Sequence, residues 1–109
     1  MSLAKKKCIP CEGGIPKLTG SEVNLYRKLI NADWRVKDTN KLERKFRFVN
    51  FKHTMNFVNR VAEIAEQEGH HPLMHTGYGE CTLELWTHAI NGLSENDFIL
   101  AAKIDVSSS

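Results

Sequence analysis

The longest periodic segment of the chain lies between residues 51 and 68, and it predicts an amphipathic helix. Apolar residues recur there every three to four positions, which places them along one helix face: Phe51, Met55, Val58, Ala62 and Ala65, with Phe57, Val61 and Ile64 widening the stripe. Gly69 follows as an expected left-handed cap, and Pro72 stops the helix from continuing. Because such a helix must bury its apolar face, we expect it to lie on a sheet.

Segments on both sides of this helix alternate apolar and polar residues, as half-buried strands do. Leu42, Phe46 and Phe48 share one face of a predicted strand, although Arg44 interrupts that face. A short extended segment at 34–36 and a turn at 37–40 precede it. A later strand at about 79–87 places its side chains on two faces: Cys81, Leu83 and Leu85 on one, and Thr82, Glu84, Trp86 and His88 on the other.

Capping residues predict one helix at each end of the chain. The first begins after Thr19 and reaches about Asn31; the last is capped by Ser94, with Asp97 as the acidic half of a capping box, and should fray at 107–109. Residues 1–18 are proline- and glycine-rich and are expected to form an irregular extension. The order of elements predicts an α+β fold, with helices packed on an antiparallel sheet, in a single domain spanning 1–109.

Charge and hydropathy narrow the partners that we expect. A net charge of +2 gives no basic stripe for nucleic acid, and the run Lys5-Lys6-Lys7 is expected to be a solvated tail. No segment has the apolar length of a membrane span, and no apolar block marks a secretory signal. We therefore expect a cytoplasmic protein without a nucleic-acid or membrane partner; an organelle stays open, since a transit peptide can be removed.

The three cysteines, Cys8, Cys11 and Cys81, favour a reducing compartment. Cys8 and Cys11 have the spacing of a zinc or redox motif. A zinc site needs about four ligands, however, and no helix start follows the pair. We therefore expect an ordinary N-terminal segment.

The pair His70-His71 is the feature that points most directly to chemistry. It falls in a corner between the helix end and Pro72, where packing does not require two imidazoles. Glu66 lies one helical turn before His70, so its carboxylate can reach the corner. Imidazoles beside a carboxylate can donate and accept protons near neutral pH. The alternative is that these histidines are surface or capping residues.

A metal site is the competing chemical interpretation. Its candidate ligands are His70, His71, His75, His88 and Cys81. The side chains of adjacent histidines diverge, the helical HExxH arrangement is absent, and Cys81 is expected to face the core. We therefore predict no metal. The sequence also lacks a GxSxG nucleophile motif and a glycine-rich phosphate loop.

These residues carry a resemblance to the pterin-4a-carbinolamine dehydratase family over about residues 33–105. The motifs are Glu66, His70-His71-Pro72, Tyr78, Thr87-His88, Gly92-Leu93 and Asp97, supported upstream by Trp34, Leu42, Phe46, Phe48, Phe51, Phe57, Val61 and Ala62. The N-terminal Cys8-Ile9-Pro10-Cys11 with Gly13-Gly14 resembles the extension of plant-type and protist members. One departure is Leu73-Met74, where many members have an acidic residue and then Trp.

The resemblance implies a fold, an assembly and a reaction. It implies a four-stranded antiparallel sheet with three helices on one face, the extra strand falling near 73–76, in a homodimer or homotetramer. It implies removal of water from a 4a-hydroxytetrahydropterin to give the quinonoid dihydropterin in tetrahydrobiopterin recycling, with no metal and no organic cofactor.

The expected site follows from the residue pattern and from this resemblance together. His70, His71 and His88 are the candidate catalytic residues, with Glu66 orienting the histidine pair. Gly69, Trp86, Thr87 and Ala89 flank these histidines and are expected to bind the pterin together with them. The alternatives are a dimerisation cofactor of a transcription factor, known among animal relatives, a metal-dependent enzyme, or the same fold in another pterin, folate or molybdopterin pathway.

Overall fold

Four antiparallel strands form one sheet in the computed structural model, which describes residues 2–9 and 15–108. The strands are β1 (Arg35–Lys37), β2 (Lys41–Arg47), β3 (Leu73–Thr76) and β4 (Glu80–Leu85), in the order β1-β2-β4-β3. The helices are α1 (Gly20–Arg27), α2 (Phe51–Glu68) and α3 (Glu95–Ser108). Two 3₁₀ turns, η1 (Leu3–Lys5) and η3 (His88–Ile90), complete the described elements. The predicted α+β fold is confirmed, including the strand at 73–76.

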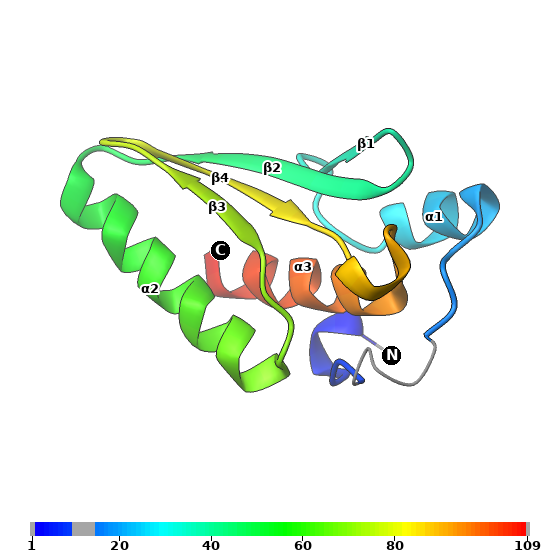
Figure 1. The fold of residues 1–109 in the computed structure, drawn as a ribbon. Helices are drawn as coiled ribbons and strands as arrows, with labels where there is room; N and C mark the ends of the chain where they lie inside the picture. Colours follow the sequence, from blue (N-terminus) through cyan, green and yellow to red (C-terminus); the bar gives the residue numbers. More distant parts are fainter. Residues whose placement is uncertain (1, 10–14, 109) are drawn as a thin grey trace.

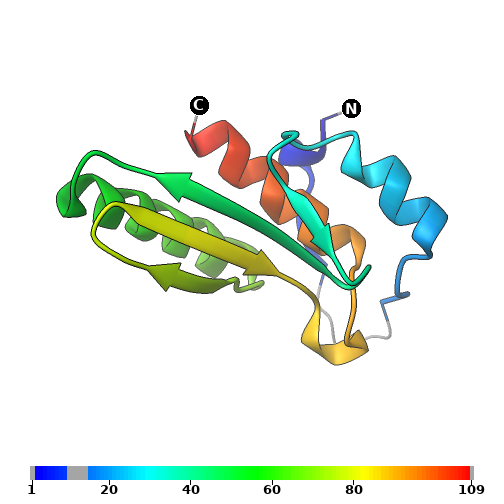
Figure 2. The same ribbon diagram turned by 90° about the horizontal axis from the view of Figure 1, so that it is seen from above.

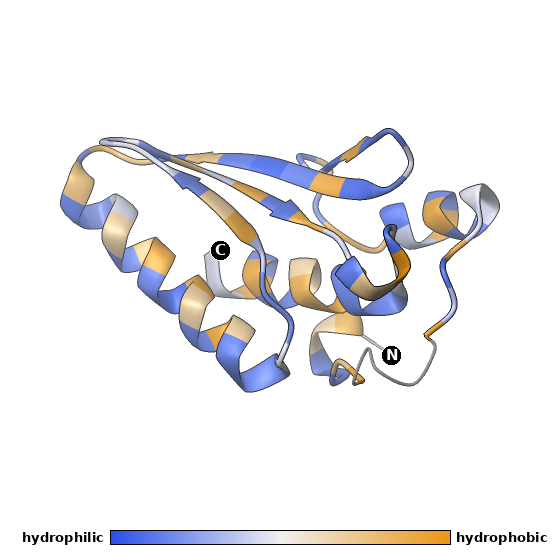
Figure 3. Ribbon diagram, in the orientation of Figure 1, coloured by the Kyte–Doolittle hydropathy of each residue, from blue (hydrophilic) through white to orange (hydrophobic). Residues whose placement is uncertain are grey.

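One face of the sheet is covered by helices, and the other is open (Figures 1 and 2). Helix α3 is the central element of the covered side, and Phe98, Ile99, Leu100 and Ala101 are all buried. A helix that is apolar all round must be surrounded by protein. Figure 3 shows this composition along most of α3, whereas α2 alternates apolar and polar residues. Strand β4 turns Cys81, Leu83 and Leu85 into the core, as predicted.

The face of α2 that is buried in the structure lies to one side of the stripe predicted from the sequence. Phe57, Val61 and Ala65 are buried, together with Thr54, while Phe51 is half exposed. Thr54 can be buried because its hydroxyl donates to the backbone carbonyls of Asn50 and Tyr78. Periodicity located the helix correctly, but the angle of packing on the sheet selected the buried line of residues.

Several terminal predictions need correction. Helix α1 ends at Arg27 rather than near Asn31, and α3 continues to Ser108 instead of fraying from Ser107. Helix α1 does begin with the expected capping box between Thr19 and Glu22. The lysine run is not a free tail, because Lys6 Nζ lies 2.7 Å from Glu95 Oε2. Buried Leu3 in η1 anchors the same segment to the core.

A cluster of polar contacts joins three parts of the chain at one end of the sheet. Trp34 is fully buried, and its indole Nε1–H donates to Asp105 Oδ1 of α3 at 2.7 Å. Arg44 donates to the same carboxylate oxygen at 2.8 Å, which explains how an arginine can occupy the inner face of β2.

Within the described residues, no helix is long and apolar enough to span a bilayer.

Candidate functional site

The first part of the site is the sharp corner at the end of α2. Gly69 has φ 65° and ψ 26°, the left-handed conformation expected for a helix cap. Its N–H and that of His70 both donate to the carbonyl of Ala65. Helix and corner thus fix the backbone of both histidines before β3 begins.

His70 points inward from this corner and is held by Asp97. The ring is buried, and its Nε2 lies 2.6 Å from Oδ1 of the fully buried Asp97 in the first turn of α3. The other carboxylate oxygen accepts hydrogen bonds from Thr87 Oγ1 at 2.8 Å and from the Ser94 backbone N–H at 3.0 Å. A carboxylate fixed in this way determines the orientation of the imidazole and which ring nitrogen faces it.

The predicted capping box at Ser94 is formed only in part. Asp97 accepts from the Ser94 N–H as expected, but the Ser94 hydroxyl contacts Thr87 Oγ1 at 2.8 Å. Asp97 therefore both stabilises the start of α3 and positions His70. From the sequence, Asp97 is expected only as part of the cap and of the family motif, and its contact with His70 is not predicted; its place in the motif is the one sequence signal for this contact.

His71, in contrast to His70, is exposed. Its Nε2 lies 2.5 Å from Glu66 Oε2 in the last turns of α2. Glu66 therefore contacts one histidine of the pair, whereas the sequence predicts that it orients both. The two imidazoles consequently differ in their surroundings: one is buried against an acid, and the other is open to solvent with an acid beside it.

His88 approaches from a different part of the chain. It begins η3, just after β4, and the loop is closed by a bridge between Thr87 and Gly92. The exposed imidazole packs against the half-buried indole of Trp86, with ring centroids 4.4 Å apart. Lys41 Nζ lies over the same indole, 4.5 Å from its ring centroid, which is within the range of a cation–π interaction.

The three histidines meet at one cavity of about 300 Å³. Gly69, His70, His71, His88 and Ala89 line it. This volume is at the lower end for sites that hold small molecules. The structure therefore brings together five of the eight residues predicted for the site. Thr87 and Trp86 lie behind this lining, in contact with Asp97 and His88, and Glu66 lies behind His71.

The remaining histidines lie elsewhere. His53 contacts Asn50 at the start of α2, and His75 pairs with Glu84 across the open face of the sheet, with Nε2 and Oε2 2.5 Å apart. Within residues 2–9 and 15–108, no three His, Cys, Asp or Glu side chains are arranged to hold a metal ion.

Cys8 has the properties of a structural thiol. Its Sγ lies 3.5 Å from the carbonyl of Asn96, and burial, reinforced by nearby Glu68, raises its pKa to about 12. A thiol with so high a pKa is a poor nucleophile and a poor metal ligand at neutral pH. Cys11, the second residue of the predicted motif, lies outside the described residues.

An α+β domain with a histidine-lined cavity beside the end of its long helix defines the class of this protein. Residues 16–107 match the model of the family "Pterin 4 alpha carbinolamine dehydratase". The chain belongs to this family.

Individual relatives agree with that assignment. A Rickettsia canadensis protein, described provisionally as a pterin-4-alpha-carbinolamine dehydratase, is 50% identical over 103 residues, which is 94% of each chain. The crystal structure of a "transcriptional coactivator/pterin dehydratase" from Brucella melitensis is 29% identical, with a TM-score of 0.80, and covers 86% of this chain and all of its own. A pterin dehydratase-like RuBisCO assembly factor of the alpha-carboxysome shares the fold alone (24% identity, TM-score 0.59, covering 68% of this chain and 87% of its own).

Proposed function

We propose that this protein removes water from 4a-hydroxytetrahydrobiopterin, with its histidines as the acid and base, in tetrahydrobiopterin recycling. The observation that carries the proposal is the convergence of His70, His71 and His88 on one cavity from two separate segments of the chain. Family membership supports the reaction class.

The chemistry needs one acid beside the C4a hydroxyl and one base beside the neighbouring ring nitrogen. The C4a hydroxyl leaves as water after an imidazolium donates a proton to it. Loss of the proton from the neighbouring ring nitrogen then forms the carbon–nitrogen double bond of the quinonoid product. The acid has then lost one proton and the base has gained one, so the reaction balances overall, and exchange of protons with solvent returns both groups to their starting states. Proton transfers of this kind typically contribute ~10²–10⁴-fold each.

The surroundings of the three imidazoles suggest different roles. His71 and His88 are exposed and can exchange protons with solvent between turnovers. His70 is buried against Asp97, an arrangement suited to binding and orienting the pterin. Backbone groups of Gly69 and Ala89 at the cavity complement the amide-like edge of a pterin ring.

The test is dehydration of synthetic 4a-hydroxytetrahydrobiopterin, followed by its ultraviolet absorbance. The wild type should accelerate the spontaneous reaction, and His71→Ala and His88→Ala should each lose about 10²-fold of that acceleration while remaining folded. His75→Ala is the matched control, since His75 is an exposed histidine outside the cavity. Loss of activity in the control, or full activity in both cavity variants, would refute the assignment.

A protein-binding role is the second candidate, because the Brucella relative is described as a transcriptional coactivator as well as a pterin dehydratase. This role predicts that binding of the partner protein is unchanged by His71→Ala and by His88→Ala.

Within the catalytic proposal, a different pterin, folate or molybdopterin precursor is distinguished by comparing turnover of each 4a-hydroxylated substrate. A cytoplasmic homodimer or homotetramer completes the proposal; light scattering measures its mass.

A further inference from the structure

Strand β2 has an uncovered edge along its second half. β1 pairs only with Lys41, Leu42 and Glu43, so no strand of the described residues lies beyond residue 43 on that side. The N–H of Phe48 donates to Gly79 at 2.8 Å, toward β4. Because backbone groups in an antiparallel strand alternate in direction, Lys45 and Arg47 direct theirs away from β4. Among the described residues, none forms a hydrogen bond with these outward backbone groups.

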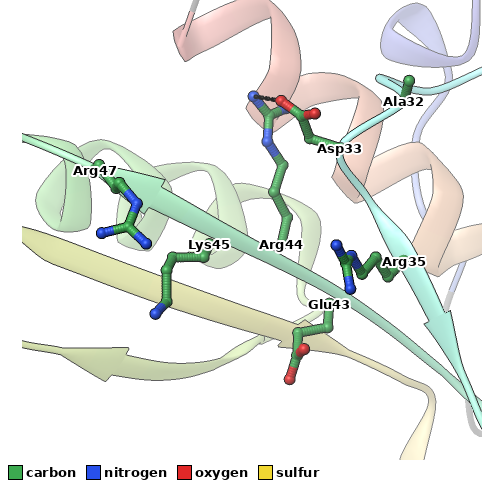
Figure 4. Close-up of a pocket in the computed structure, with 7 residues that line it drawn as sticks. All are labelled: Ala32, Asp33, Arg35, Glu43, Arg44, Lys45 and Arg47. Carbon is green, nitrogen blue, oxygen red and sulfur yellow. Dashed lines mark ion pairs between the residues drawn. The ribbon is translucent and has the colours of Figure 1, made fainter.

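Two adjoining cavities follow this edge. One has a volume of about 490 Å³ and is lined by residues of β2, β1 and the loop before β1 (Figure 4). The other, of about 370 Å³, shares Asp33, Arg44, Lys45 and Arg47 with the first and continues to Phe48 and α2. Together they form a hollow beside the free backbone, which we call the β2-edge groove.

The two sides of the groove differ in chemistry. Lys45 and Arg47 are exposed on the open face of the sheet. On the helix side, Phe46, Phe48 and Phe57 form an apolar floor. The Arg60 guanidinium lies 6.0 Å from the Phe57 ring centroid. An added strand would present alternate side chains to these two sides.

The charge of the groove is predominantly positive. Its cations are Arg35, Arg44, Lys45, Arg47 and Arg60, against the carboxylates of Asp33 and Glu43. Arg44 is already paired with Asp105, so the other four supply the positive charge. Arg35 has no ion-pair partner among the described residues, and Lys45 and Arg47 share the single exposed carboxylate of Glu80, at 3.4 and 3.9 Å. Exposed pairs of this kind contribute little and remain available to a partner.

The same charges disfavour a second copy of the chain as the occupant. Antiparallel self-pairing centred on Phe46 would bring Lys45 of one copy opposite Arg47 of the other, twice. Like charges directly opposite each other destabilise a pair of strands. An acidic segment has the complementary charge.

We propose that the β2-edge groove binds an extended acidic segment of a partner protein, which pairs with the backbone of Lys45 and Arg47 as an added strand. Acidic side chains of the segment face Lys45 and Arg47, and apolar ones face the phenylalanine floor. The surface is separate from the histidine cavity, so occupancy and dehydration are independent.

The probe is a short fluorescein-labelled peptide that alternates glutamate with valine, titrated with the full chain and followed by fluorescence anisotropy. We expect saturable binding that weakens as salt is raised. The double variant Lys45→Glu/Arg47→Glu should bind about tenfold or more weakly. Lys5→Glu/Lys28→Glu is the matched control, because it makes the same change at exposed lysines outside the groove, and it should bind as the wild type does.

Two measurements on the wild type make the test independent of how the variants fold. A peptide N-methylated at alternate residues cannot donate to the strand edge and should lose binding, and the amide hydrogens of Lys45 and Arg47 should exchange more slowly when the original peptide is bound. Equal binding of the N-methylated peptide, or of a lysine–valine peptide, overturns the proposal. A wild-type dimer that the charge-reversal variant dissociates overturns it as well, since a second copy then occupies the edge.

Discussion

At the scale of single residues, Asp97 controls the buried histidine. It is the acceptor for His70, Thr87 and the Ser94 N–H at once. In Asp97→Asn the side chain keeps its shape, but its charge is lost and one oxygen becomes an amide donor. We expect dehydration to fall by about 10²-fold, because His70 loses the orientation in which it positions the pterin. Steady-state rates for the two proteins measure this.

Glu95→Gln is the control for that substitution. It removes a carboxylate from the same helix turn, where Glu95 pairs with Lys6 rather than with a histidine. The control should retain wild-type activity. An Asp97→Asn protein that keeps its full rate would show that His70 does not depend on this carboxylate.

The pair of His75 and Glu84 gives a residue-scale prediction for pH. The hydrogen bond from His75, followed by the effect of Lys41, holds the Glu84 pKa below its ordinary value of 4.5. A carboxyl group whose pKa is lowered in the folded state makes its full contribution to the stability of the folded protein when the pH is above the ordinary pKa. This contribution disappears as the pH falls through the lowered pKa. Glu84→Gln should therefore lower the free energy of unfolding at neutral pH, and the difference should shrink on acidification.

Urea unfolding at neutral pH and at a pH well below 4.5 measures this difference. Glu63→Gln is the control, since Glu63 is exposed and has no ion pair in the described part of the chain. A deficit of Glu84→Gln that stays constant with pH would contradict the linkage.

At the scale of elements, the end of α2 depends on the backbone of Gly69. A Cβ at Gly69 would meet no atom of the described residues within 4 Å, so we expect the cost of Gly69→Ala to come from the positive φ. We expect a loss of about 1–2 kcal/mol in the free energy of unfolding, measured by urea denaturation. Because the corner carries His70 and His71, dehydration should slow in the same variant.

Gly20→Ala is the matched control for the helix cap. Gly20 also has open space around its Cβ position, but it begins α1 without a positive φ. The control should be neutral or slightly stabilising. Equal destabilisation by both substitutions would mean that the left-handed cap is not the source of the effect.

At the scale of the whole molecule, Asp105 joins the loop before β1, strand β2 and helix α3. Its carboxylate accepts from Trp34 Nε1, Arg44 and the backbone N–H of Asn31. Asp105→Asn leaves the half-buried Arg44 without its close counter-charge, so we expect a loss of about 1–3 kcal/mol in the free energy of unfolding. Thermal or urea unfolding measures it.

Asp33→Asn tests whether that effect belongs to Asp105. Asp33 is largely exposed and lies 3.7 Å from Arg44, so its removal should change the free energy of unfolding by less than about 1 kcal/mol. A larger loss for Asp33→Asn than for Asp105→Asn would show that Arg44 is stabilised mainly from the loop.

The sequence by itself determined the features that depend on near neighbours in the chain. The 51–68 helix, its Gly69 cap and the alternation of β2 and β4 follow from local periodicity and backbone preferences. The contact of Glu66 with the histidine corner was predictable for the same reason, because one helical turn separates them.

Only the tertiary structure decided which distant groups meet. Asp97 reaches His70 across 27 residues, and His88 enters the cavity because β4 returns beside β3 before η3 begins. The buried line of α2 shifted to Thr54, Phe57, Val61 and Ala65 because the angle of helix on sheet is set by the packing of the core. Sequence periodicity specifies the face of an element, whereas the close packing of several elements fixes the partners of each side chain.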